Sequence, residues 1–328
     1  GKVKLGYINL PSFYMDMEAA RRNEVDYRSS TRDVERILRD FKSQNVGGVV
    51  LDLTRNGGGS LTEAISLTGL FIDRGPVVQV KNSDGSVQQY SDDQSGTVWD
   101  GPLVVVTSKL SASASEIFAG AIKDYHRGIV VGDPATHGKG TVQTLMDIGQ
   151  SLFRNNNANY GALKVTLQQF YLPDGESTQL KGVEADLVLP SMTSKLPVAE
   201  GDLEYALEFD KVPLAKHSLY AMTPDSLLNS LRINSANRVQ QDKEFSELMR
   251  RIELYVREKD QKSISLNEEE FLRRRAERKA QTEAEEEELD EVLNNDEIFR
   301  DTYYNKEVMN VAHEYVTGLR SQNLAVAK

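Results

Sequence analysis

The sequence predicts an α/β fold with a mixed, largely parallel sheet flanked by helices, followed by an α-helical region. Short apolar runs such as those at 49–53 and 103–107 indicate buried strands. These runs alternate with segments of helical spacing, an order typical of a parallel sheet. From about Met192, glycine becomes rare and charge becomes dense. We therefore divide the chain into a core at 1–191 and a helical extension at 192–328.

The first elements follow from local patterns. Residues 3–10 are strand-like, and the polar segment 18–30 is a loop or a solvated helix. Ser30 or Thr31 is expected to cap the next helix, with Asp33 near its positive end. The apolar residues of that helix recur at helical spacing, at Val34, Ile37, Leu38 and Phe41.

Turns and further apolar runs complete the core. A glycine turn at 55–60 opens a second helix, and Asn-Ser-Asp-Gly at 82–85 is a hairpin signature. A loop at 108–113 leads into a helix at 116–125. The remaining strands are expected at 129–131, 163–172 and 185–189.

Beyond the core, apolar residues on helical spacing indicate amphipathic helices around Leu227–Leu231 and 245–256. Residues 268–291 predict a charged helix that ends in an acidic run at 283–291. Such a run is a solvated face or arm, or a contact for a basic partner. The extension as a whole is a candidate surface for an adaptor or regulatory protein.

Composition excludes several classes of protein. The 39 basic and 50 acidic residues give a net charge of −11, so the basic footprint of a nucleic-acid binder is absent. The lack of cysteine excludes a disulfide scaffold, a thiol nucleophile and a cysteine zinc site. Neither a metal nor a cofactor is expected, because the four histidines are scattered, at His126, His137, His217 and His313. No apolar run of about 18 residues predicts a membrane span, and the first residues lack a signal-peptide pattern.

A serine-rich turn is the first candidate for chemistry. Residues 111–116 read Ser-Ala-Ser-Ala-Ser-Glu and connect a strand to a helix. By itself this pattern is typical of capping by Ser113 or Ser115, with Glu116 in the first turn. A serine nucleophile there needs a base, because its hydroxyl is inert at its free pKa. No His–Asp pattern stands out.

Lys139 is the better candidate for a base. It lies between Gly138 and Gly140 in a compact loop that starts at Gly132. A lysine acts as a base only when neutral, and burial favours the neutral amine. The alternatives are a surface lysine or a phosphate-binding one. The P-loop pattern is absent, because glycine rather than serine or threonine follows the lysine.

The glycine turn at 55–60, Arg-Asn-Gly-Gly-Gly-Ser, is the third element. It does not contain GxGxxG, the signature of a dinucleotide-binding turn. Beside a nucleophile, its N–H groups can form half of an oxyanion hole.

Together, in this order and spacing, the three elements resemble the carboxyl-terminal processing, or tail-specific, proteases. These enzymes are Ser-Lys peptidases with a crotonase/ClpP-like fold. The resemblance covers about residues 1–190, and the helical remainder is similar to the C-terminal extension of the larger bacterial periplasmic members. It rests on SASASEIFAGA at 111–121, GKGTVQ at 138–143, LDLTRNGGG at 51–59 and QLKGVEAD at 179–186.

Position by position, the resemblance implies roles for five residues. The family's nucleophile falls on Ser113, its general base on Lys139, and the residue that orients the lysine on Gln143. The oxyanion hole falls on the amides of Gly58 and Ala114. The implied reaction is cleavage of protein substrates with exposed apolar C-terminal tails, through an acyl-enzyme.

One further position and two departures qualify this assignment. Asp124 matches an aspartate implicated in the tail-specific branch, and we expect a structural role for it, in pairing with Arg127 or closing the helix end. The loop before Lys139 is one residue longer than usual, and His137 stands where an aromatic is common. The sequence also lacks the PDZ domain that the family carries before the first strand, so weakened substrate selection is expected. The resemblance implies a periplasmic or otherwise exported protein.

Three other functions remain open at this point. Another Ser-Lys amidohydrolase is disfavoured, because the amidase pattern needs a second serine in a glycine-serine run. A non-catalytic ligand-binding relative of the same fold is disfavoured by the presence of both Ser113 and Lys139. A scaffold or adaptor role is confined to the helical extension.

Overall fold

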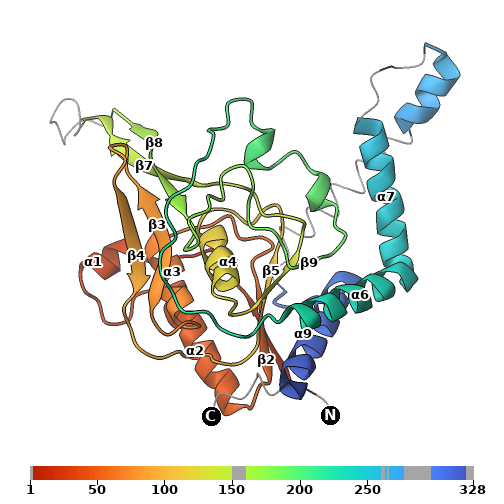
Figure 1. Ribbon diagram of the computed structural model, residues 1–328. Helices are drawn as coiled ribbons and strands as arrows, with labels where there is room; N and C mark the ends of the chain where they lie inside the picture. Colours follow the sequence, from red (N-terminus) through yellow and green to blue (C-terminus); the bar gives the residue numbers. More distant parts are fainter. Residues whose placement is uncertain (1–2, 150–159, 260–262, 264–265, 277–296, 323–328) are drawn as a thin grey trace.

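The computed structural model describes residues 3–149, 160–259, 263, 266–276 and 297–322. Its parallel sheet has the order β1-β2-β5-β6-β9 (Figure 1). The register runs across the sheet from Tyr7 to Val50, Val104 and Ile129. These strands are β1 (Leu5–Asn9), β2 (Gly48–Asp52), β5 (Leu103–Thr107), β6 (Ile129–Gly132) and β9 (Leu187–Val188).

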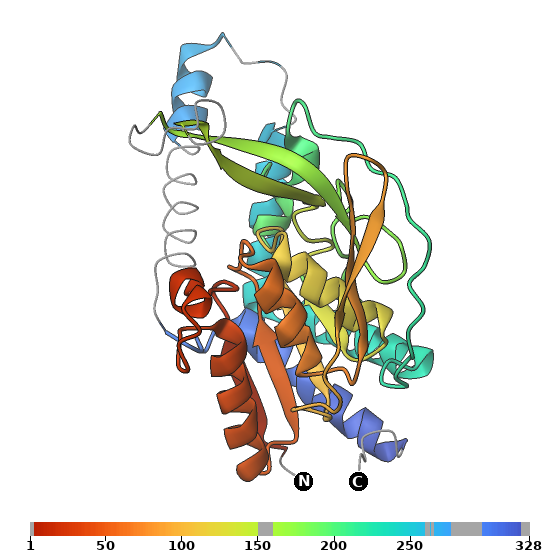
Figure 2. The same ribbon diagram turned by 90° about the vertical axis from the view of Figure 1, so that its left-hand side faces the viewer.

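A second sheet is antiparallel, with the order β4-β3-β8-β7. The hairpin of β7 and β8 extends away from the body of the molecule (Figures 1 and 2). The fold class predicted from the sequence is confirmed, and the antiparallel strands form a sheet of their own. They are β3 (Gly75–Lys81), β4 (Val87–Asp92), β7 (Thr141–Asp147) and β8 (Ala162–Tyr171).

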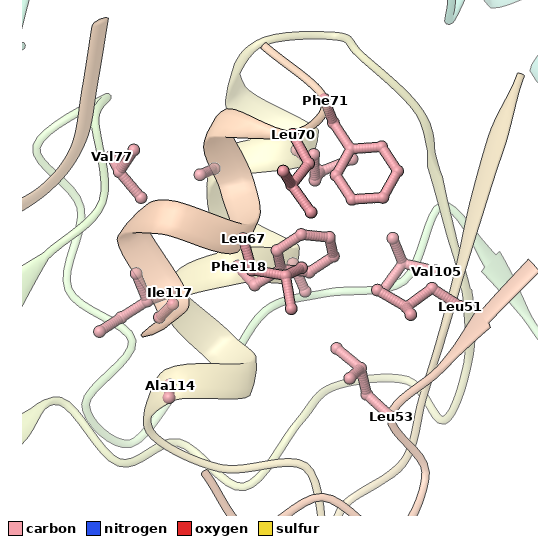
Figure 3. Packing of buried hydrophobic residues seen from close by; sticks show 14 of the residues in the cluster. Leu51, Leu53, Leu67, Leu70, Phe71, Val77, Val105, Ala114, Ile117 and Phe118 are labelled. Atoms are coloured by element: carbon pink, nitrogen blue, oxygen red, sulfur yellow. The ribbon is translucent and has the colours of Figure 1, made fainter. Parts of the chain in front are cut away.

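The order of the parallel sheet advances in one direction through β6. Right-handed crossovers in such a sheet place their helices on a single face. Helices α2 (Ser30–Ser43), α3 (Leu61–Gly69) and α4 (Ala114–Asp124) are these crossovers. Figure 3 shows α3 and α4 packed together over β2 and β5, with Phe118 near Phe71. The two fully buried rings pack edge to face with their centroids 5.7 Å apart, which holds α4 against the end of α3.

The C-terminal helices cover the opposite face of the parallel sheet. Helices α6 (Asp225–Gln241) and α9 (Tyr303–Ser321) pack there, and α7 (Lys243–Lys259) follows α6 and contacts α9. One apolar cluster contains Val104 and Val131 of the sheet together with Leu231 of α6 and Val311 of α9. The division at residue 191 therefore lies within a shared core. No helix in the described part of the chain is long and apolar enough to cross a membrane.

Local expectations were met in most places and corrected in a few. The hairpin at 82–85 joins β3 to β4, as predicted. The cap of α2 is Ser29, not Ser30 or Thr31, because the Ser29 Oγ accepts the N–H of Arg32. Segment 18–30 begins with a short helix, α1 (Met17–Arg21). Of the charged stretch 268–291, residues 268–276 are helical and the acidic run lies outside the described residues.

If α9 completes the core, Leu319→Ala should destabilise the whole protein. Leu319 is fully buried against the second face of the sheet. Loss of a buried leucine side chain typically costs about 2–5 kcal/mol. We expect a single thermal transition at lower temperature, measured by calorimetry. Leu219→Ala is the control, because Leu219 is 64% exposed. Separate melting of the helices, with the rest unchanged, would contradict a shared core.

Candidate functional site

The candidate site lies where β5 ends and α4 begins. Ser113 is the N-cap of α4, with φ of 56° and ψ of −110°. A positive φ is strained for a residue with a side chain, and such strain clusters at functional sites. Ser113 is half-buried, and its side chain makes no capping hydrogen bond. The predicted cap position is thus confirmed, with Ser113 as N-cap and Glu116 in the first turn, but the bond that caps the helix uses the Ser113 N–H and leaves its hydroxyl unused.

The two flanking serines serve the structure. Ser111 is fully buried, and its Oγ donates to the carbonyl of Leu53 at 2.7 Å. Ser115 is also fully buried, and its Oγ donates to the carbonyl of Asn56 at 2.8 Å. Both hydroxyls fasten the serine loop to β2 and the glycine turn. Within the described residues, Ser113 is the one serine of the three whose hydroxyl has no such partner.

The buried carboxylate of Glu116 joins the serine loop to the lysine loop. Its Oε2 accepts the backbone N–H of Ser113 at 2.7 Å and that of Lys139 at 3.0 Å. Its Oε1 accepts the N–H of Gly138 at 2.7 Å and the hydroxyl of Thr136 at 2.6 Å. One carboxylate thus holds the backbone of the predicted nucleophile and that of the predicted base.

The ionisation of Glu116 reflects two opposing effects. Burial raises the pKa of Glu116 to about 7, while the hydrogen bonds from Thr136 and the three amides favour the carboxylate. A raised folded-state pKa means that the folded protein holds this proton more tightly than the unfolded chain does. The contribution of Glu116 to stability therefore falls as pH rises from 4.5 toward 7.

The lysine loop is fixed on its other side by residues of the late motif. The Thr178 Oγ1 donates to the carbonyl of Lys139 at 3.0 Å. The N–H of Gly140 donates to the Gln179 Oε1 at 2.8 Å. Both flanks of Lys139 are therefore hydrogen-bonded, and the lysine backbone is supported on either side.

The side chain of Lys139 contacts Gln143, which lies in β7. The lysine Nζ donates to the Gln143 Oε1 at 3.4 Å. Partial burial lowers the pKa of Lys139, and the positive charge of Lys164 lowers it further. The described contacts contain no hydrogen bond between the Ser113 Oγ and the Lys139 Nζ. The structure brings the two residues together through their backbones, and catalytic hydrogen bonds often tighten only when substrate binds.

The glycine turn packs directly against the nucleophile loop. A Cβ built on Gly58 would lie 3.0 Å from the Cβ of Ser113 and 3.3 Å from the N of Ala114. The two residues predicted to form the oxyanion hole are therefore neighbours. The N–H of Gly58, however, donates to the Asn56 Oδ1 at 2.9 Å. Its role as an oxyanion donor stays a prediction, since the amide must first leave this bond or share it.

Neither His137, in the lysine loop, nor His126 is paired with the serine in the described contacts. His137 is half-buried, its backbone N–H donates to the carbonyl of Ser111 at 3.0 Å, and burial lowers its pKa. His126 is exposed after the end of α4.

Of the two structural roles expected for Asp124, pairing with Arg127 is not observed, because Asp124, at the end of α4, bonds a backbone amide. The Asp124 Oδ2 accepts the N–H of Asp174 at 2.9 Å. Burial raises the pKa of Asp124 to about 7, and the Asp174 carboxylate adds to the effect. Arg127 is fully buried and donates to the carbonyls of Phe71 and Trp99, both at 2.7 Å. Asp124 instead fastens the turn after β8 to the end of α4.

Two further features of the described chain are a cavity and the absence of a group that could hold a metal ion. A cavity of about 420 Å³ opens beside the ends of β1, β2 and β5, and neither Ser113 nor Lys139 lines it. No group of three or more acidic, histidine or cysteine residues that could hold a metal ion occurs among the described residues.

The profile of peptidase family S41 matches residues 4–189, more than half of the chain. The chain belongs to peptidase family S41. Residues 193–317 match the profile of the C-terminal domain of tail specific protease. The first match covers the core and the second covers the helical extension, and both agree with the resemblance to tail-specific proteases that the motifs indicated.

Three of the proteins to which this chain is similar match it over part of their lengths. The tail-specific protease of Haemophilus influenzae is 36% identical over 265 residues, covering 80% of this chain and 36% of that protein. The chloroplastic C-terminal processing peptidase of Tetradesmus obliquus is 31% identical over 188 residues, covering 57% of this chain and 36% of that one. A solved photosystem II D1 C-terminal processing protease has 31% identity and a TM-score of 0.44, over 56% of this chain and 42% of that one. The chain thus spans about a third of the length of these curated S41 relatives.

Sequence reasoning missed the residues that hold the site together. It placed Glu116 only in the first turn of a helix and gave Gln179 no role. The available signal for Glu116 was its position three residues after Ser113, from which a carboxylate reaches back to the N-cap amide. Nothing local in the sequence indicated that the same carboxylate would also bind Lys139.

We predict that Glu116→Gln loosens both loops. The amide retains one acceptor oxygen, so its N–H group must face backbone donors such as those of Ser113 and Lys139. Leaving buried donors unsatisfied typically costs about 1–3 kcal/mol. Thermal unfolding should show this loss, and hydrogen exchange should accelerate at the amide of Lys139.

The matched control is Glu63→Gln. Glu63 is also buried, and it accepts the hydroxyls of Ser29 and Ser30 away from the site. This variant should lose stability without faster exchange at Lys139. Equal hydrogen-exchange rates at the Lys139 amide in the two variants would show that Glu116 does not restrain the lysine loop.

Proposed function

We propose that the chain is the catalytic part of a serine endopeptidase that uses Ser113 and Lys139 as a dyad. The observation that carries this proposal is the shared Glu116 carboxylate, which fixes the strained serine and the lysine loop to one group. Membership of peptidase family S41 supports the same reaction class.

In the proposed reaction, neutral Lys139 removes the proton of Ser113 Oγ as the oxygen attacks a peptide carbonyl carbon. The resulting ammonium then protonates the amine as the carbon–nitrogen bond breaks. Water attacks the acyl-enzyme with Lys139 again as base, and Ser113 is released. Gln143 orients the amine, because its Oε1 accepts a hydrogen bond from the Lys139 Nζ.

The tetrahedral oxyanion needs backbone donors. The Ala114 amide is suited to this role, because the first N–H groups of a helix have no partner within the helix. We assign the second donor to Gly58, whose backbone lies beside Ser113. Removing one oxyanion donor typically costs about 2.7–4 kcal/mol of transition-state stabilisation.

For substrates, we propose proteins with exposed apolar C-terminal tails, acted on outside the cytoplasm. Relatives named tail-specific and C-terminal processing proteases support the choice of substrate end. The helical extension is the proposed surface for an adaptor or regulatory protein.

The dyad predicts that Ser113→Ala and Lys139→Ala each abolish cleavage of an unfolded protein with an apolar C-terminal tail. Gel electrophoresis and mass spectrometry of the products measure the cleavage. Ser115→Ala is the control, since that hydroxyl bonds only a carbonyl. It should lower stability and retain cleavage. Cleavage by the Lys139→Ala variant at the parent rate would rule out the lysine base.

The pH profile should follow the ionisation of Lys139. Activity rises with pH as the ammonium loses its proton, and the rise should be centred below the ordinary lysine value of about 10.4. Lys164→Gln removes a charge that lowers the pKa of Lys139, so the rise should move to higher pH. Lys42→Gln, on α2, should leave the profile in place. An unchanged profile in Lys164→Gln would contradict the assignment of the titrating group.

A further inference from the structure

Gln179 is a fully buried side chain whose hydrogen-bonding groups are all used. Its Oε1 accepts the N–H of Gly140 at 2.8 Å. Its Nε2 donates to the Glu200 Oε1 and to the carbonyl of Leu207, both at 3.0 Å. The amide therefore connects the residue after Lys139 to a segment twenty and more residues further along the chain.

That segment, residues 199–208, is here called the strap. It belongs to the stretch between β9 and α6 that wraps around the core (Figure 1). The strap touches the lysine loop at a second point, because the N–H of Glu200 donates to the carbonyl of His137 at 2.9 Å. Glu200 thus contacts the lysine loop through its backbone and Gln179 through its side chain.

We infer that Gln179 and Glu200 form a clasp that closes the strap on the lysine loop and positions Lys139. Neither residue touches the reacting atoms, so both are positioning residues. The inference rests on the proposed function for its catalytic consequence, but the clasp itself is a structural claim about the loop.

The packing around the clasp leaves little freedom. A Cβ on Gly140 would lie 2.7 Å from the N of Gln179 and 2.8 Å from its Cβ, so the two backbones are in close contact. The orientation of the Gln179 amide is also fixed, because a flipped amide would face two acceptors with its oxygen and the Gly140 N–H with its nitrogen. A substitution at Gln179 or Glu200 should therefore shift the position of Lys139.

The clasp also contributes charge near the lysine. The groups that act electrostatically on Lys139 are Lys164, Glu200 and Glu116, and the ring of His137 lies close enough to be affected by it. The negative charge of Glu200 favours the ammonium, in opposition to Lys164 and burial. The clasp therefore affects both where the amine lies and the pH at which it becomes neutral.

A swap of the two partners tests the clasp. Gln179→Glu keeps the acceptor for Gly140 but sets a carboxylate against the Glu200 carboxylate. Adding Glu200→Gln supplies an amide that donates to the new carboxylate, which restores the bond between the two side chains with its direction reversed and the pair's charge at the parent value, while the bond to the Leu207 carbonyl stays lost. Gln169→Leu is the control, because Gln169 also donates to the strap, at the carbonyl of Glu208, and makes no described bond to the lysine loop.

We expect Gln179→Glu to lower kcat about tenfold with little change in KM, a fraction of the 10²–10⁴ that general-base catalysis contributes. Its activity profile should move to higher pH, and that of Glu200→Gln alone to lower pH. The swapped pair should recover part of the lost kcat, together with the parent pH profile. Gln169→Leu should match the parent in kcat and in its pH profile.

A readout without activity separates the clasp from the proposed function. In protein labelled with ¹³C-lysine, the NMR titration of Lys139, assigned by Lys139→Arg, should move in the same directions as the profiles. If Lys139 titrates as expected while the parent cleaves nothing, the clasp stands and the proposed function fails. If Gln179→Glu leaves the titration and kcat unchanged, or the swap recovers neither, the clasp is overturned.

Discussion

The site depends on one buried carboxylate. Glu116 lies in the first turn of α4, and Phe118 of the same helix belongs to one buried apolar cluster with Leu51 and Val105 of the sheet. From there the carboxylate accepts four hydrogen bonds, from the serine loop on one side and the lysine loop on the other. A buried charge is costly unless it is hydrogen-bonded, so moving any of these donors away from the carboxylate would raise the free energy of the folded protein. The two loops are therefore held in place by a side chain that the packed core itself positions.

The surrounding hydrogen bonds extend this arrangement outward. Asn56, fully buried, fixes the glycine turn by accepting the N–H of Gly58 and donating to the carbonyl of Leu10. Gln179 fixes the lysine loop from behind. Each of these polar side chains is buried and bonded to backbone atoms, which positions a main chain more precisely than side-chain contacts alone. Preorganisation of this kind suits a reaction that relies on a single base and on backbone donors.

The sequence predicted the features that depend on local pattern. The strands at 49–53 and 103–107, the hairpin at 82–85 and the helix after Ser113 follow from periodicity and turn residues, and the fold class followed from their order. It could not predict contacts between segments far apart in the chain. Glu116 with Lys139 and Gln179 with Glu200 are such contacts. Arg127 illustrates the opposite error: its charge suggested a carboxylate partner, whereas the structure gives it backbone carbonyls.

The most direct test of the account is covalent labelling of the protein with a fluorophosphonate, located by peptide mass spectrometry. The account predicts one adduct, on the Ser113 Oγ, formed faster as pH rises and lost in Lys139→Ala. It also predicts much slower labelling in Glu116→Gln than in Glu63→Gln, because Glu116 bonds the backbone of both loops whereas Glu63 bonds neither of them. Labelling of Ser111 or Ser115, or equal rates in the two glutamate variants, would contradict it.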